Sequence, residues 1–77
     1  MVKRRIMLIF PSGFVSEPIV YNIGQQFNVV TNIRQASLTE EGGYIVVELI
    51  GEGNDIEAGI AWAISKGVRV DLISGEI

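Results

Sequence analysis

The sequence predicts a ferredoxin-like α+β sandwich with the element order β-α-β-β-α-β. An apolar strand, a helix and a second strand follow one another in residues 3–39, and the same succession returns in residues 43–74. Two adjacent glycines, Gly42 and Gly43, lie between the halves and supply the positive φ angles that a hairpin needs. We therefore expect residues 1–77 to form a single domain.

The first predicted strand covers residues 4–10, where nearly every position is apolar. Such a run is typical of a central strand that is buried on both faces. Alternation divides its apolar side chains between the faces, with Ile6, Leu8 and Phe10 on one and Met7 and Ile9 on the other.

The first predicted helix has Ser16 as its N-cap, Pro18 in its first turn and Asn28 at its end. Its buried stripe is expected to consist of Val20, Ile23 and Phe27. Gly24 weakens a helix by up to ~1 kcal/mol relative to alanine, which indicates a close approach between this helix and the sheet.

Residues 30–39 are more polar, and this polarity favours an edge strand. The alternation predicts one face made of Asn32, Arg34, Ala36 and Leu38, and another made of Thr31, Ile33, Gln35 and Ser37. Residues 44–50 are rich in Ile, Val and Leu and predict the second central strand.

The second helix is expected to begin with Asn54 as its N-cap and to stop at Gly67. Its predicted core stripe consists of Ile56, Ile60, Ala63 and Ile64. In the segment that follows, Val68, Val70 and Leu72 alternate with Arg69 and Asp71, as expected for the other edge strand.

Right-handed crossovers place both helices on the same face of the sheet, and the predicted antiparallel strand order is 4-1-3-2. The other face then carries Met7 and Ile9 without a helix over them. We expect a second copy of the chain to cover this face as a homodimer. The alternative is an apolar surface that remains exposed to water.

Composition excludes several classes of function. The net charge is −3 and the pI is about 4.7, which argues against nucleic acid as a partner. The chain has no cysteine and no histidine, so thiol, imidazole and Fe–S chemistry are excluded, as are the usual zinc sites. We expect no enzyme activity, no cofactor and no metal. The apolar runs are too short for membrane insertion, and we expect a cytoplasmic protein.

Four side chains have two interpretations each. Glu48 either contacts a ligand ammonium or a cross-strand arginine, or it is an exposed carboxylate on the uncovered face, and we favour the exposed carboxylate. Trp62 lies outside the predicted core stripe of the second helix, so we expect it either to contact a partner or to pack on the other helix. For Met7, ordinary sheet packing is favoured over contact with a thioether ligand. The Asn32 carboxamide suits an amino acid, because it offers donors and an acceptor together; the alternative is an asparagine that tolerates a local bulge or simply faces water.

Several motifs in order resemble the NIL domain family over roughly residues 4–73. They are Phe27–Ile33, the Gly-Gly hairpin, Val47-Glu48-Leu49 with Gly51, Ala61-Trp62-Ala63, and Gly67–Asp71. The family takes its name from an Asn-Ile-Leu triplet, and Arg34 stands at the leucine position of this chain.

The resemblance implies a ferredoxin-like, ACT-like regulatory module that dimerises and binds an amino acid, which is methionine in the transporters. It implies a partner on another chain, either a methionine-importer ATPase or a ferredoxin-type module. Asn32 and the adjacent Ile33 are the implied ligand-binding residues, and no catalytic residue is implied. The alternative is a structural domain that docks a partner, without a ligand, through its open sheet face or its edge strand.

Overall fold

The structure is a computed structural model, and it describes residues 1–12 and 18–73. Its elements are β1 (Val2–Phe10), α1 (Ile19–Gln26), β2 (Val30–Thr39), β3 (Gly42–Gly51), α2 (Gly53–Ser65) and β4 (Arg69–Leu72). The predicted β-α-β-β-α-β succession is confirmed. The predicted N-cap, Ser16, lies outside the described residues.

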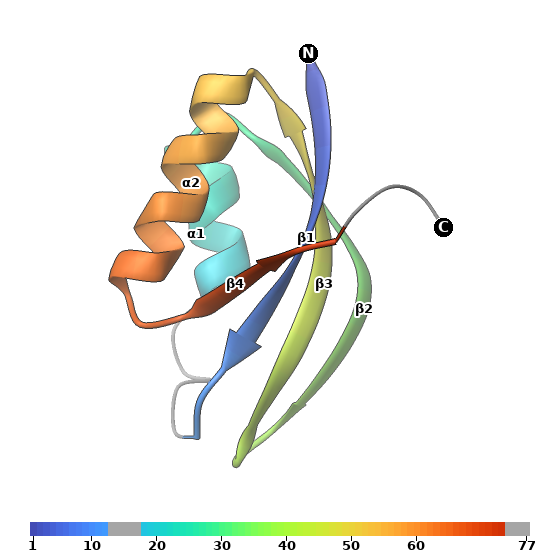
Figure 1. The fold of residues 1–77 in the computed structure, drawn as a ribbon, viewed down its shortest axis with the longest axis vertical. Helices are drawn as coiled ribbons and strands as arrows, with labels where there is room; N and C mark the ends of the chain where they lie inside the picture. The colour runs from blue at the N-terminus through green and yellow to red at the C-terminus, as the bar shows by residue number, and fades with distance from the viewer. Residues whose placement is uncertain (13–17, 74–77) are drawn as a thin grey trace.

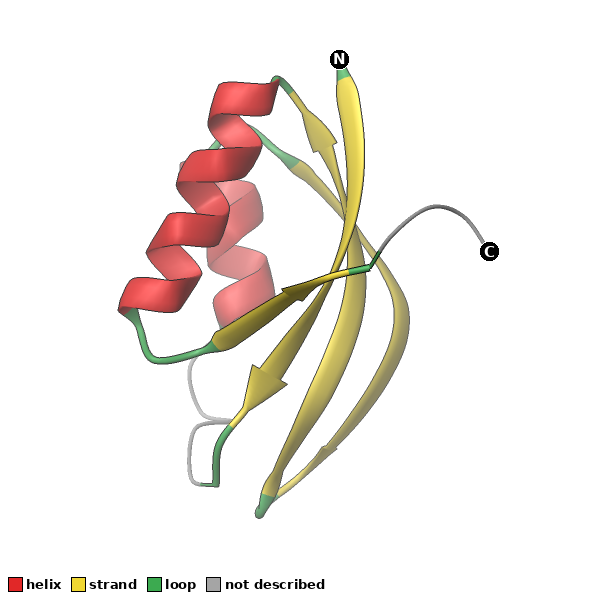
Figure 2. Cartoon of the chain, viewed as in Figure 1, coloured by secondary structure: helices red, strands yellow, loops and turns green. Residues whose placement is uncertain are grey.

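The strands form one antiparallel sheet in the order β2-β3-β1-β4, as predicted. The two most apolar strands, β1 and β3, occupy the middle, and β2 and β4 form the edges. Figure 1 shows α1 and α2 side by side on one face of this sheet. In Figure 2, no helix of the described chain lies over the other face, which we call the open face.

The core lies between the helices and the sheet. Its largest fully buried side chains, none more than 1% exposed, are Ile6, Leu8, Val47 and Leu49 from the strands and Ile19, Ile23 and Ile56 from the helices. The predicted alternation of β1 is confirmed, because Met7 and Ile9 lie on the open face and are only half-buried.

Strand register defines the open face, since residues paired across neighbouring strands share a face. Its side chains are Lys3, Arg5, Met7 and Ile9 of β1, Tyr44, Val46, Glu48 and Ile50 of β3, Val30, Asn32, Gln35 and Ser37 of β2, and Arg69 and Asp71 of β4. Apolar side chains of the central strands form part of the middle of this face beside the charged Arg5 and Glu48, and Arg69 and Asp71 lie at the β4 edge.

The predicted alternation of β2 is wrong beyond Ile33. The register shifts between Ile33 and Gln35, so Arg34 is the extra residue of a β-bulge. Because the bulge inserts a single residue, every later side chain changes face. The residues affected are Gln35, Ala36, Ser37 and Leu38.

The buried stripe of α1 is also shifted from its prediction. Ile19 and Ile23 are its buried residues, whereas Val20 and Phe27 are only half-buried. The reason is that α1 packs against α2 as well as against the sheet. Its most buried side chains are therefore those that point to where α2 and the sheet meet. Asn28 follows the helix with φ +55°, consistent with its predicted role at the helix end.

In α2 the buried residues are Ile56, Gly59 and Ala63, and the prediction for Ile64 is wrong because this side chain is 55% exposed. Gly59 explains the shift. A Cβ atom there would lie 3.3 Å from the Cγ2 atom of Ile23, so the helices approach each other at this glycine.

The ends of α2 differ in how well the sequence predicted them. The helix begins at Gly53, so Asn54 lies inside its first turn and is not the N-cap. The predicted stop at Gly67 is confirmed, with φ +99°. The Gly67 N–H donates to the Ile64 carbonyl and the Val68 N–H to the Ala63 carbonyl, the paired bonds of a Schellman motif.

Gly24→Ala is expected to raise the free energy of unfolding by ~0.5–1 kcal/mol, because alanine favours the helix. A Cβ atom at Gly24 would lie 3.5 Å from the Val29 carbonyl oxygen, an ordinary contact distance. Urea denaturation measures the change. Gly59→Ala is the matched control and should gain less, since its Cβ would crowd Ile23. Equal gains for the two variants would contradict this account of the helix interface.

Candidate functional site

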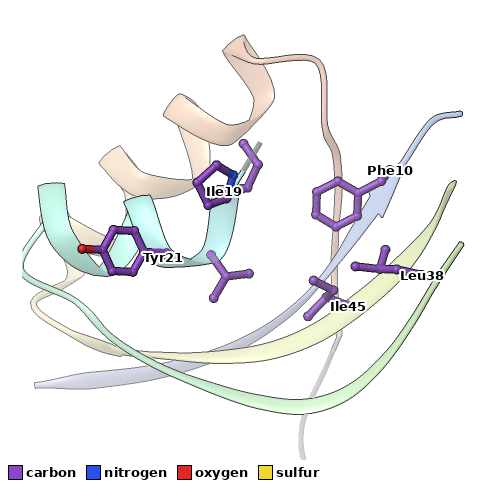
Figure 3. A pocket seen from close by; sticks show the side chains of 7 residues that line it. Phe10, Ile19, Tyr21, Leu38 and Ile45 are labelled. Atoms are coloured by element: carbon purple, nitrogen blue, oxygen red, sulfur yellow. The ribbon is translucent and has the colours of Figure 1, made fainter. Parts of the chain in front are cut away.

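A cavity of about 190 Å³ lies on the helix side of the sheet, between the start of α1 and the β2–β3 hairpin. Its lining side chains are Phe10, Pro18, Ile19, Val20, Tyr21, Leu38 and Ile45, as Figure 3 shows. None of these described residues carries a charge. Because an amino acid must have partners for both of its charged groups, this cavity suits only an apolar group.

The predicted residue Asn32 belongs to a different place, a row of polar side chains on the open face. Asn32 of β2 pairs with Glu48 of β3, and Glu48 pairs with Arg5 of β1. Neighbouring strands lie about 4.8 Å apart, so these three residues span about 10 Å across the sheet. We call Asn32, Glu48 and Arg5 the polar row.

Ile33, the other predicted site residue, lies on the opposite face from Asn32, as strand alternation predicted. It pairs with the buried Val47 on the helix side of the sheet, and it is 53% exposed. A ligand resting on the open face therefore contacts the side chain of Asn32 but not that of Ile33.

Glu48 is held by arginines from both neighbouring strands. The Arg5 Nη2 donates to Glu48 Oε2 at 2.7 Å, and the Arg34 Nη1 lies 4.0 Å from Glu48 Oε1. The favoured expectation of an exposed carboxylate is wrong, since Glu48 is only 7% exposed. The alternative, a cross-strand arginine, is confirmed. The guanidinium groups cover the carboxylate where no helix does.

Positive charge gathers on the open face although the chain carries a net charge of −3. The basic side chains that lie on this face or reach it are Lys3, Arg5, Arg34 and Arg69. Among its described residues, the face has only Glu48 and Asp71 as acidic partners. Asp71 is occupied by Arg69 at 3.3 Å, so the positive surplus lies around Glu48.

The electrostatics of the polar row shift one pKa. The hydrogen bond from Arg5 holds the pKa of the Glu48 carboxyl below its ordinary value of 4.5. Burial acts in the opposite direction, and the charges of Arg5, Arg34 and Lys3 lower the pKa further. Glu48 is therefore ionised at neutral pH and binds its arginines as a carboxylate.

Trp62 lies away from the polar row, at the interface of the two helices. Its ring centroid is 6.0 Å from that of Phe27, and the Lys66 Nζ lies 5.7 Å from the indole centroid. The expected packing on the other helix is thus confirmed, and Trp62 remains half-buried.

Two surveys of the described residues complete the description of the site. In the ranges 1–12 and 18–73, no three Asp or Glu side chains gather into a group that could hold a metal ion. Neither α1 nor α2 has the length and apolar character that a membrane-spanning helix needs.

The sequence analysis did not identify three features of this site, which are Arg5 as the cross-strand arginine of Glu48, the approach of Arg34 and the burial of Glu48. The position of Arg5 had a signal, because strand alternation places it on the same face of β1 as Met7 and Ile9, which is the open face. Arg34 had a similar signal, because the predicted alternation of residues 30–39 assigns it to the same face as Asn32.

Comparison with known proteins supports a family assignment. The model of the NIL domain family matches residues 4–72. Among solved structures, the C-terminal domain of an ABC transporter ATP-binding protein from Enterococcus faecalis is similar to this chain, with a TM-score of 0.81 and 27% sequence identity. The similarity covers 95% of this chain and 86% of that one. No curated protein matches the chain.

Glu48→Gln is expected to reduce the loss of stability in acid. Because folding lowers the pKa of Glu48, its contribution to stability is present above about pH 4.5 and is lost as the pH falls through the folded-state pKa. Unfolding free energies measured from about pH 7 to about pH 3 should therefore fall less steeply for the variant than for the wild type. Parallel curves would show that folding does not lower this pKa.

Proposed function

This chain belongs to the NIL domain family, and we propose that it is a regulatory domain that binds an amino acid, methionine or a close relative, and thereby modulates an ABC transporter ATPase on another chain. The observation that carries the proposal is the similarity to the C-terminal domain of an ATP-binding protein of an ABC transporter, over nearly the whole of both chains.

The proposal assigns sensing, and not the transport cycle, to this chain. Its sequence contains no Walker P-loop, the motif whose backbone amides and lysine bind the phosphates of ATP. The proposal assigns ATP hydrolysis to the partner. We propose no catalytic role for the chain and a cytoplasmic location, where a transporter ATPase meets the amino-acid pool.

Asn32 is the ligand-binding residue of the proposal. Its carboxamide presents both donors and an acceptor on the open face, next to the paired charges of the polar row. Met7 and Val46 lie beside this row and offer apolar contact to a side chain such as that of methionine. Ile33 has no contact with the open face, and its role in binding stays a prediction.

A homodimer is part of the proposal because the open face has an apolar middle. Met7, Ile9, Tyr44 and Ile50 are all half-buried there, in a domain too small to bury much of its surface alone. A second copy that covers this face would remove the apolar side chains and a bound ligand from water.

The second candidate function is a docking domain without a ligand, with a transporter ATPase or a ferredoxin-type module as its partner. The observation that favours it is the exposure of large apolar side chains along the edge strand β2. Val30 is 62% exposed, Ile33 53% and Leu38 43%. An edge strand with such side chains can accept a strand from another protein.

Methionine is expected to bind with a dissociation constant near micromolar, since its roughly nine heavy atoms contribute at most about 1 kcal/mol each. Isothermal titration calorimetry measures this affinity. Asn32→Ala should abolish binding, and Ser37→Ala, on the same face of the same strand, should leave it unchanged. Absence of heat and of a rise in melting temperature with any amino acid would favour the docking function.

Ile9→Asp is expected to weaken self-association, because it would place a charge in the apolar middle of the proposed dimer interface. Ile64→Asp is the matched control, since Ile64 is 55% exposed on α2, on the other side of the sheet. Sedimentation equilibrium measures both. If Ile64→Asp weakens self-association as much as Ile9→Asp does, the dimer interface does not lie on the open face.

A further inference from the structure

We propose that Arg5 and Arg34 bind the carboxylate of a zwitterionic amino acid. Asn32, at the other end of the polar row, accepts a hydrogen bond from the ammonium group of the same ligand through its Oδ1 atom. The inference rests on the proposed function and deepens it. It assigns the carboxylate of the ligand to Arg5 and Arg34, which the family resemblance does not identify, and it limits the ligand to molecules that carry a free carboxylate.

The first argument is an imbalance of charge. Two guanidinium groups flank the carboxylate of Glu48, and among the described residues only Arg5 forms a side-chain hydrogen bond with it, at 2.7 Å. Arg34 lies 4.0 Å from the other oxygen, which is close enough for attraction but too far for a hydrogen bond. The cluster therefore keeps one positive charge in excess, and a second carboxylate would neutralise it.

The second argument is unused donor capacity. A guanidinium carries five N–H donors, and two of them on one edge match the two oxygens of a carboxylate. The Arg5 Nε is buried and has no acceptor among the described residues, and the side chain of Arg34 is 50% exposed. Both arginines thus have donors to offer to a further acceptor.

The third argument is the geometry of the bulge. Arg34 is the extra residue of β2, and its guanidinium approaches Glu48 together with that of Arg5 from β1. Alternation from Asn32 already places Arg34 on the open face, and the extra residue adds Gln35 to this face directly after it. Bulges commonly redirect a side chain in this way beside functional sites.

The fourth argument is the distance between the two ends of the polar row. Asn32 and Arg5 are separated by one strand, so their backbones lie about 10 Å apart. Their side chains lie on the same face of the sheet, one on each side of Glu48. The apolar pair of Met7 and Val46 lies in the next row of the sheet, where the ligand side chain would rest.

Calorimetric titration of the full chain with three probes tests the inference. L-methionine carries both charges, L-methioninol lacks the carboxylate, and N-acetyl-L-methionine lacks the ammonium group. Wild-type protein should bind methionine at least about tenfold more tightly than methioninol, because hydrogen bonds to charged groups contribute that much.

The variants locate the carboxylate. Arg34→Gln should weaken the binding of methionine at least about tenfold and leave the affinity for methioninol unchanged. Arg34→Lys should recover part of the lost affinity. Arg69→Gln is the matched control, because Arg69 lies on the same face but pairs with Asp71, and it should bind methionine as the wild type does. Thermal melting verifies that each variant is folded.

The possible results separate this inference from the proposed function. If the wild type binds methionine and methioninol equally, or if Arg34→Gln binds methionine as tightly as the wild type, the assignment of the carboxylate is overturned and amino-acid sensing stands. If the wild type binds none of the probes, both are overturned. The comparison of methionine with methioninol needs only the wild type, so the test holds even if a variant fails to fold.

Discussion

Both helices pack on the same face of the sheet, as right-handed crossovers require for this order of elements. Each of the two central strands therefore has one face against the helices and one face that no helix covers. Ile6 and Leu8 of β1 face the helices and are fully buried, whereas Arg5 and Met7 alternate with them on the open face. Arg5 and Glu48 of the central strands lie on the face that no helix covers, and the same one-sided cover leaves an apolar middle for a ligand or a second copy.

The burial of Glu48 shows how the open face stabilises a charge without a helix. A carboxylate removed from water is costly unless charged donors replace its hydration. Arg5 of β1 supplies a hydrogen bond, and the charge of Arg34, at the bulge of β2, approaches the carboxylate from the other neighbouring strand. Fold and candidate site are thus linked through one cluster, in which the side chains that cover Glu48 are also those that offer positive charge to a ligand.

Local sequence patterns were sufficient for the strand order, the two faces of β1, the hairpin glycines and the stop of α2 at Gly67. Each of these follows from side-chain periodicity or from a backbone conformation that glycine favours. The bulge at Arg34 was not predictable, since the polar residues of β2 give no hydrophobic pattern that fixes the register. The helix stripes were shifted because the two helices meet at Gly59, a contact between distant parts of the chain.

The assignment of binding to the open face is tested by mapping backbone amide chemical shifts during a titration with L-methionine. The account predicts that the largest changes fall on Arg5, Asn32 and Glu48, while helix-side residues such as Ile23 and Ile56 change little. Changes concentrated on Ile19, Leu38 and Ile45, which line the helix-side cavity, would contradict it.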